Sequence, residues 1–203
     1  MKTYVLSALF LLSALSVLNA QREETVLGRR GLGFSGIWWN WNHQLAQFDE
    51  TNAYVKGSQF GLEFGKSLFL GYGRYRIHNN VRWSDPVASN FDMRFNAFKI
   101  GYAFQAYKAV HPVLNVDLGG AKATLDGEGE DRLFIVQPAA GIEFNVFRWF
   151  RVVVEGGYRF TTDSDFPGIN DRDLSGAFGQ ATFRFGYSWG STHKKKNYEQ
   201  DWE

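Results

Sequence analysis

Ten charged side chains are the residues of this chain best placed to do chemistry, because they recur at alternate positions of regularly patterned segments. Acids and bases that share one face can pass a proton or an ion along a pathway, or they can pair with one another and fill a closed interior. We favour the second interpretation, because buried charges need partners. The set consists of Glu63, Arg74, Arg76, Lys99, Asp117, Glu143, Arg151, Glu155, Arg159 and Arg184.

Two acidic segments offer a second kind of chemistry. Calcium takes about six to eight oxygen ligands, so carboxylates on neighbouring loops can hold it or share cations with the phosphates of lipopolysaccharide. Neither segment matches an EF-hand, and acidic loops commonly serve only to keep a rim solvated. We therefore predict no resident metal or other cofactor. The candidates for weak calcium binding are Asp126, Glu128, Glu130, Asp131, Asp163, Asp165, Asp171 and Asp173.

The histidines show no catalytic pairing. A serine nucleophile needs a base within reach, and no histidine lies two residues from a serine on one strand face. The four histidines are His43, His78, His111 and His193. We predict that the protein is not an enzyme.

The charged residues lie in segments where apolar and polar residues alternate, which is the pattern of a β-strand with two different faces. The clearest example runs from Pro138 to Phe160, where two such segments follow each other around a tight reversal. One strand stays ambiguous, because Trp38, Trp39 and Trp41 load both of its faces. The predicted strands are residues 31–42, 54–66, 69–78, 92–107, 111–124, 133–146, 150–162 and 175–190.

The connections between these strands are alternately short and long. The short ones lie near residues 67–68, 108–110 and 147–149, and the long polar ones span 43–53, 79–91, 125–132 and 163–174. Such alternation is typical of a membrane barrel with tight periplasmic turns and extracellular loops. A basic side chain facing lipid near the midplane costs about 2–4 kcal/mol, so the charged face is expected to line the lumen.

The N-terminus has the layout of a secretory signal peptide, with Lys2 followed by an uncharged apolar run and a small residue at Ala20. The chain contains no cysteine, which excludes a disulfide-stapled domain. Without Lys2 it carries 21 basic and 21 acidic residues, so nothing in it attracts nucleic acid. We predict a signal peptide at 1–20, a short periplasmic segment at 21–30, a barrel at 31–190 and a polar tail at 191–203.

These features resemble a known family. The eight-strand layout, the inward charges of the 138–160 hairpin and the last strand with Phe183, Phe185, Tyr187 and Trp189 are similar to small outer-membrane barrels of the OmpX and OmpA transmembrane-domain kind. The hairpin is also similar to uncharacterised barrels of Bacteroidota. The resemblance implies an all-β, eight-stranded, antiparallel up-and-down transmembrane β-barrel, a monomer in contact with outer-membrane lipid and lipopolysaccharide. The tail is too short for the peptidoglycan-binding domain that follows OmpA-like barrels.

The favoured function is a barrel in the bacterial outer membrane with a salt-bridged, largely closed lumen. Its role would be structural, or the binding of a protein or other surface ligand at the long loops. A narrow channel for ions or small solutes is the alternative. A lipid-modifying enzyme lacks its histidine–serine pair, and a soluble lipocalin-like binder requires apolar inward residues, which Arg151, Glu155 and Arg159 contradict.

Overall fold

The computed structural model describes residues 33–48, 51–79, 81–83, 89–125, 129–166 and 169–189. The chain divides into two compact units, Met1–Gly33 and Phe34–Glu203, and all of the described strands belong to the second. The predicted signal peptide, the segment 21–30 and the tail 191–203 lie outside the described residues.

The described fold is almost entirely β-structure. It contains one short helix, α2 (Asp171–Leu174), and this part of the chain holds no helix long and apolar enough to cross a membrane. The strands are β1 (Phe34–Phe48), β2 (Thr51–Phe64), β3 (Leu68–Ile77), β4 (Val81–Trp83), β5 (Ser89–Ala103), β6 (Val110–Leu125), β7 (Gly129–Phe147), β8 (Phe150–Thr162) and β9 (Gly176–Ser188).

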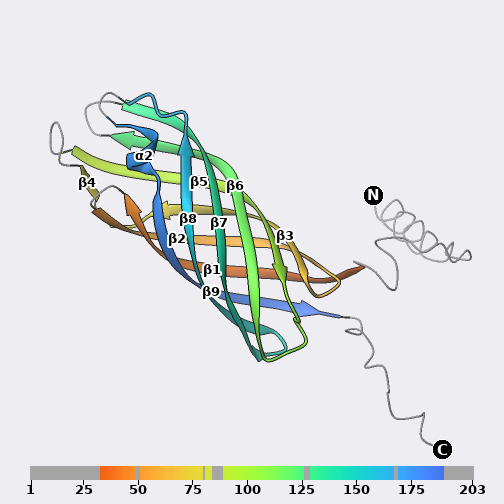
Figure 1. The fold of residues 1–203 in the computed structure, drawn as a ribbon. Coiled ribbons are helices and arrows are strands. Elements are labelled where there is room, and N and C mark those ends of the chain that lie inside the picture. The colour runs from red at the N-terminus through yellow and green to blue at the C-terminus, as the bar shows by residue number, and fades with distance from the viewer. Residues whose placement is uncertain are drawn as a thin grey trace, which may run out of the picture. The chain divides into compact units, whose positions relative to one another are not determined.

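Eight of these strands close into an antiparallel barrel (Figure 1). Consecutive strands pair from β1 to β3 and from β5 to β9, β1 pairs with β9, and β3 pairs with β5. The three-residue β4 is an addition that pairs with one end of β5. The predicted fold, an eight-stranded antiparallel up-and-down transmembrane barrel, is confirmed.

Short turns gather at one end of the barrel, which we call the turn end. They comprise residues 65–67, 104–109 and 148–149. The opposite end, the loop end, carries α2 and the segment from Asp163 to Ser175 (Figure 1).

At the loop end the strands extend beyond their predicted limits. β1 and β2 remain paired as far as Phe48 and Thr51, and β6 and β7 as far as Leu125 and Gly129. The predicted long loops at 43–53 and 125–132 are therefore wrong, because most of their residues continue the ladders. Inward apolar residues such as Ala46 and Val55 give these extensions a core of their own.

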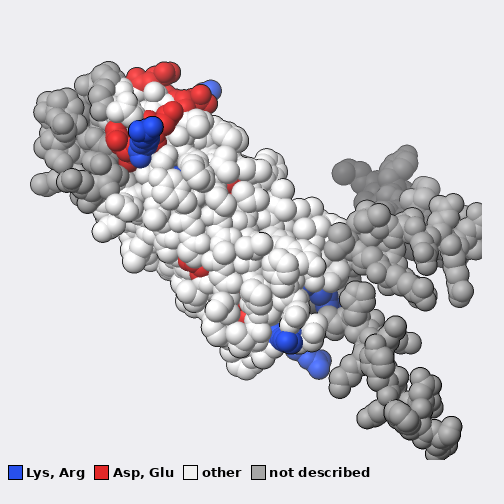
Figure 2. Space-filling view, viewed as in Figure 1, with Lys and Arg blue, Asp and Glu red and all other residues white. Residues whose placement is uncertain are grey.

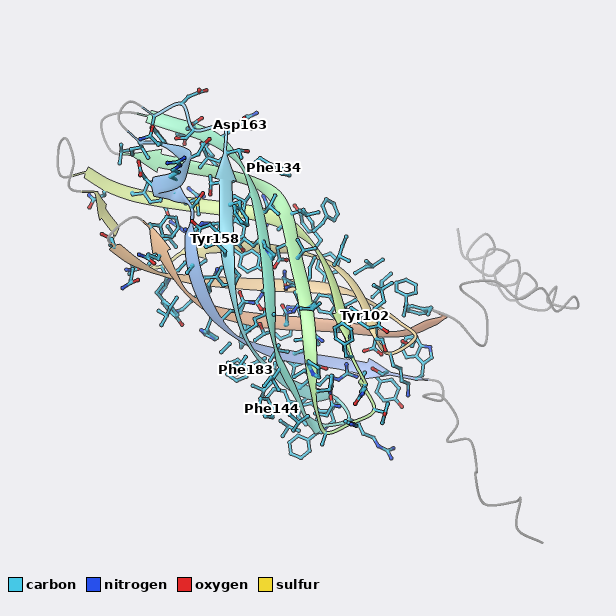
Figure 3. The ribbon with its side chains drawn as sticks, viewed as in Figure 1. Tyr102, Phe134, Phe144, Tyr158, Asp163 and Phe183 are labelled. Atoms are coloured by element: carbon cyan, nitrogen blue, oxygen red, sulfur yellow. The ribbon has the colours of Figure 1, made fainter. Side chains whose placement is uncertain are left out.

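Large apolar side chains cover the outside of the wall, and Figure 3 shows Tyr102, Phe144 and Phe183 spread along it. The first strand follows the same rule, because Trp39 and Trp41 are exposed whereas Trp38 points inward. Its indole fills space left by Gly61 and Gly71, where an added Cβ would lie 2.5 Å from the ring. The ambiguity of this strand is thereby removed.

The polarity of both faces inverts partway along the strands. Toward the turn end of β5, Phe98 and Ile100 face outward and Lys99 faces inward, whereas toward the loop end Arg94 faces outward and Phe95 inward. The first arrangement suits lipid outside and a polar lumen, and the second suits water outside and an apolar core. A single barrel thus combines a membrane-type section and a section built like a soluble protein.

Candidate functional site

The lumen of the membrane-type section is the candidate site, and most of the predicted charges lie in it. Eight of the ten point inward from six strands and are largely buried. They comprise four acidic and four basic residues: Glu63, Asp117, Glu143, Glu155, Lys99, Arg151, Arg159 and Arg184.

Arg74 and Arg76 lie on the opposite face, so their assignment to the lumen is wrong. In β3 the inward positions are occupied by Phe69, Tyr75 and Ile77, while both arginines are exposed. The error has a physical cause, because β3 crosses the point where the two faces exchange polarity. An outward charge at this height lies above the bilayer midplane, where a basic side chain costs less than at the centre.

Nearest the turn end, Glu143 lies close to basic side chains of two other strands. Its carboxylate lies 2.6 Å from Arg184, 3.6 Å from Arg151 and 3.3 Å from the ring of His111. Arg151 also lies 2.9 Å from Glu63 and donates a hydrogen bond to the Ser188 hydroxyl. The network therefore ties β2, β6, β7, β8 and β9 together across the barrel.

The side chain of Arg184 also packs on aromatic rings. Its guanidinium carbon lies 4.2 Å from the Phe69 ring centroid and 5.4 Å from that of Trp38. Cation–π contacts of this kind stabilise a desolvated arginine. These two rings belong to an apolar cluster that fills the lumen beside the ion pairs.

A second layer joins Lys99 and Asp117 at 2.9 Å. Asp117 also accepts hydrogen bonds from the Gln59 amide at 2.9 Å and the Tyr75 hydroxyl at 3.4 Å. Each oxygen of this carboxylate therefore has a donor, which is the condition for holding a charge in a dry interior.

Glu155 lacks a basic partner among the described residues and is held by amides instead. Asn115 donates to it at 2.5 Å and Gln180 at 2.8 Å. These amides belong to a set of neutral lumen side chains that sequence reasoning missed as site residues. Their inward parity could have revealed them: Asn40, Asn42, Gln59, Asn115, Gln180 and Thr182.

Arg159 forms the boundary between the two sections. It is fully buried, donates to the backbone carbonyls of Leu174 at 3.0 Å and Gln47 at 2.8 Å, and lies 3.7 Å above the ring of Phe48. We call the segment from Asp163 to Ser175 the closing loop. Because Leu174 ends α2 within this segment, Arg159 connects the closing loop to the lumen below it.

Beyond Arg159 the interior is apolar. Phe166, Ile169 and Leu174 from the closing loop pack among inward residues of the strands. The strand residues of this cluster include Phe48, Tyr75, Ile77, Phe91, Met93, Phe95, Leu125, Leu133, Ile135 and Phe178. The sequence-based expectation of a polar interior overlooked this second core.

The acidic residues proposed for calcium mostly hold the loop backbone in place. Asp131 accepts a hydrogen bond from the Asp165 amide at 2.7 Å, so the two acidic segments do meet. Asp171 accepts from Ser164, Asp173 accepts from Asn170, and Glu130 pairs with Lys122 at 2.5 Å.

Glu130 and Asp131 belong to β7 rather than to a loop, while Asp126 and Glu128 lie outside the described residues. Asp163, at the loop end in Figure 3, has a positive φ of 69°. Within the described ranges, no three histidine or acidic side chains are grouped so as to hold a metal ion. Calcium binding stays a prediction.

The described histidines contact no serine in any hydrogen bond found in this part of the chain. His43 lies on the outer wall 2.5 Å from the Tyr54 hydroxyl, His78 stacks edge-on against the same ring, and His111 is in the lumen. His193 is outside the described residues.

The outer wall is the second feature, besides the lumen, that identifies the class of protein. The side seen in Figure 2 is largely uncharged between two charged ends, as a lipid-facing wall requires. A buried set of charges with hydrogen-bond or ion-pair partners, within such a wall, defines the class of protein, a small eight-stranded transmembrane β-barrel.

No protein-family model and no curated protein matches this sequence. Among solved structures, the chain is similar to the N-terminal β-barrel domain of Pseudomonas aeruginosa OprF, with a TM-score of 0.55, 13% identity, and 75% of this chain and 97% of that one covered. It is also similar to Neisserial surface protein A, with a TM-score of 0.53, 16% identity, and 79% and 100% of the two chains covered. At identities this low, the structural similarity shows the shared fold alone.

Proposed function

We propose that this protein is an integral barrel of the bacterial outer membrane with a closed lumen and a structural or surface-interaction role. The observation that carries the proposal is the lumen itself. Its four acidic and four basic residues are held by ion pairs, amides and carbonyls from opposite sides of the barrel. An ion would have to break these contacts to pass.

The location is supported by three independent features. These are the predicted signal peptide, the apolar outer wall and the fold shared with OprF and Neisserial surface protein A. With short turns facing the periplasm, the loop end would be extracellular. The barrel then contacts outer-membrane lipid and lipopolysaccharide through its wall, and we expect a monomer.

The closing loop is the best-supported platform for a surface ligand. Arg159 donates a hydrogen bond to the Leu174 carbonyl at the end of α2, and the Thr161 backbone amide donates one to the Ser175 hydroxyl. Phe166 packs in the apolar core at the loop end. An ordered loop loses little conformational entropy when a partner binds it. We propose no catalytic role, because no histidine–serine pair within the described ranges supports one.

Conductance in a planar bilayer distinguishes the channel alternative from the closed barrel, and gel migration shows that the barrel has folded. The protein, refolded in detergent, should migrate faster unheated than boiled, and should show no steady single-channel steps in a planar bilayer. Regular conductance steps would overturn the closed lumen. A protein that remains dispersed in buffer without detergent would overturn the membrane location.

A further inference from the structure

The outer wall carries a band of basic side chains that we call the basic groove. Its members extend outward from five strands and surround a hollow of about 1040 Å³. They are Lys56, Arg74, Arg76, Arg94, Lys122 and Arg132. Five of them are consecutive Cα partners along one row of the sheet, Lys56 with Arg76, then Arg94, Lys122 and Arg132.

The groove has a positive charge that its own carboxylates do not balance. Asp92 lies 3.3 Å from Arg76 and 3.7 Å from Arg94, and Glu130 pairs with Lys122. Arg74 has no acidic partner within 4 Å among the described residues. The floor beside it is polar or small, formed by Ser58, Asn96 and Gly120.

The groove reaches down to membrane depth on one side of the barrel. Going up from the turn end, β3 presents only Leu68, Leu70 and Tyr72 to the outside before Arg74, whereas β7 presents seven apolar residues before Arg132. A strand tilted by about 40° gains about 2.5 Å of height per residue, which puts Arg74 about 15 Å above the turn end. The apolar band of an outer-membrane barrel is about 25 Å tall.

A cationic notch at this depth needs an anionic occupant supplied by the membrane. A second copy of the chain would bring the same positive charge to a symmetric contact and repel. The phosphates of lipid A lie at the upper edge of the apolar layer of the outer leaflet, and the arginine fork matches phosphate geometry. We propose that the basic groove binds the phosphate groups of lipid A. The proposal rests on the outer-membrane location proposed above.

The test uses the full barrel refolded in zwitterionic detergent, with bound lipid counted by native mass spectrometry. The probes are diphosphoryl lipid A, lipid A stripped of both phosphates, and inorganic phosphate. We expect diphosphoryl lipid A to bind at least about tenfold more tightly than the stripped form, because charge-assisted hydrogen bonds are the strong ones. Free phosphate should bind weakly, since it lacks the acyl chains that place it in the groove.

Variants assign the binding to the groove. The double variant Arg74→Gln with Arg94→Gln should lose about tenfold in affinity for diphosphoryl lipid A, and the matching Arg→Lys double variant should keep most of it. The control, Lys108→Gln with Arg148→Gln, removes the same charge from exposed turn-end positions and should bind as the wild type does. Heat-modifiable migration verifies that each variant has folded.

Equal affinity for the phosphorylated and stripped lipids would overturn the proposal, as would unchanged binding by the Arg74/Arg94 double glutamine variant. Dimers that crosslink through the groove would overturn it as well. These failures leave the proposed location intact, because they are observed on a barrel already folded in detergent. Failure of the location appears earlier, as a chain that folds without detergent.

Discussion

The charges inside the barrel and those on its outer wall obey different rules. In the lumen, four acidic and four basic residues are enclosed, and each is held by a partner. In the basic groove, six basic side chains share two carboxylates and remain exposed. A dry interior demands that charges be compensated by the protein, whereas a wall at the membrane surface can leave that task to the lipid.

The largest effect should come from removing the carboxylate that compensates most of the lumen. Glu143→Ala leaves Arg184 without its acid and His111 without its partner. Breaking a buried ion pair by deleting one member costs about 3–5 kcal/mol. Urea unfolding of the barrel in lipid vesicles measures this loss. The matched control is Glu130→Ala on the outer wall, and an equal loss there would erase the distinction between inside and outside.

The Lys99–Asp117 pair gives a sharper test, since both partners can be removed together. Each single change, Lys99→Met or Asp117→Leu, should destabilise by about 3 kcal/mol, and the double variant by clearly less than their sum. A double-mutant cycle from unfolding curves gives the coupling. Additive losses would mean that the two charges are not compensating each other.

Arg159 has carbonyl partners in place of a carboxylate, and its removal should have a local effect. Arg159→Met keeps the length of the side chain but loses the hydrogen bonds to Leu174 and Gln47, at about 2 kcal/mol. We expect the closing loop to be cut faster by protease added outside vesicles. Unchanged cleavage relative to wild type would show that this side chain does not hold the loop.

Removing a charge from the basic groove should stabilise the barrel, whereas removing a lumen charge should destabilise it. In vesicles of zwitterionic lipid, Arg74→Leu should stabilise the barrel by about 1 kcal/mol, because it removes a charge facing lipid without an acidic partner. Lys56→Leu is a second groove variant that should have the same effect. In vesicles that contain lipid A, the stabilisation of the barrel by these variants should be reversed. Destabilisation by Arg74→Leu in zwitterionic lipid would place that side chain among the compensated charges.

Much of this barrel could be predicted from alternation alone. The period of two located the strands, and the aromatic outer faces of residues such as Phe98 and Phe183 assigned the lipid side. Arg74 and Arg76 could not be placed that way, because toward the loop end the interior becomes apolar and the basic residues lie on the outer face. The same inversion hid the apolar upper core and made strand residues such as Glu130 look like loop.

The partners of the lumen charges were also beyond reach of the sequence. Ion pairs such as Arg151 with Glu63 join residues 88 positions apart, and their pairing depends on how far each strand is staggered against the next. Neutral members such as Gln59 carry no motif of their own. The sequence could show which side chains point inward. Only the structure shows which of them contact each other.

The two neighbouring valines of β8 offer the most direct test of the account. Val154 is 54% exposed on the outer wall and Val153 is 1% exposed in the lumen, although the two have the same chemistry. In methyl-labelled wild-type protein in nanodiscs, a spin label on the lipid acyl chain should broaden the NMR signals of Val154 and leave those of Val153 sharp. Equal broadening of both, or broadening of Val153 alone, would contradict the inside-polar, lipid-facing barrel.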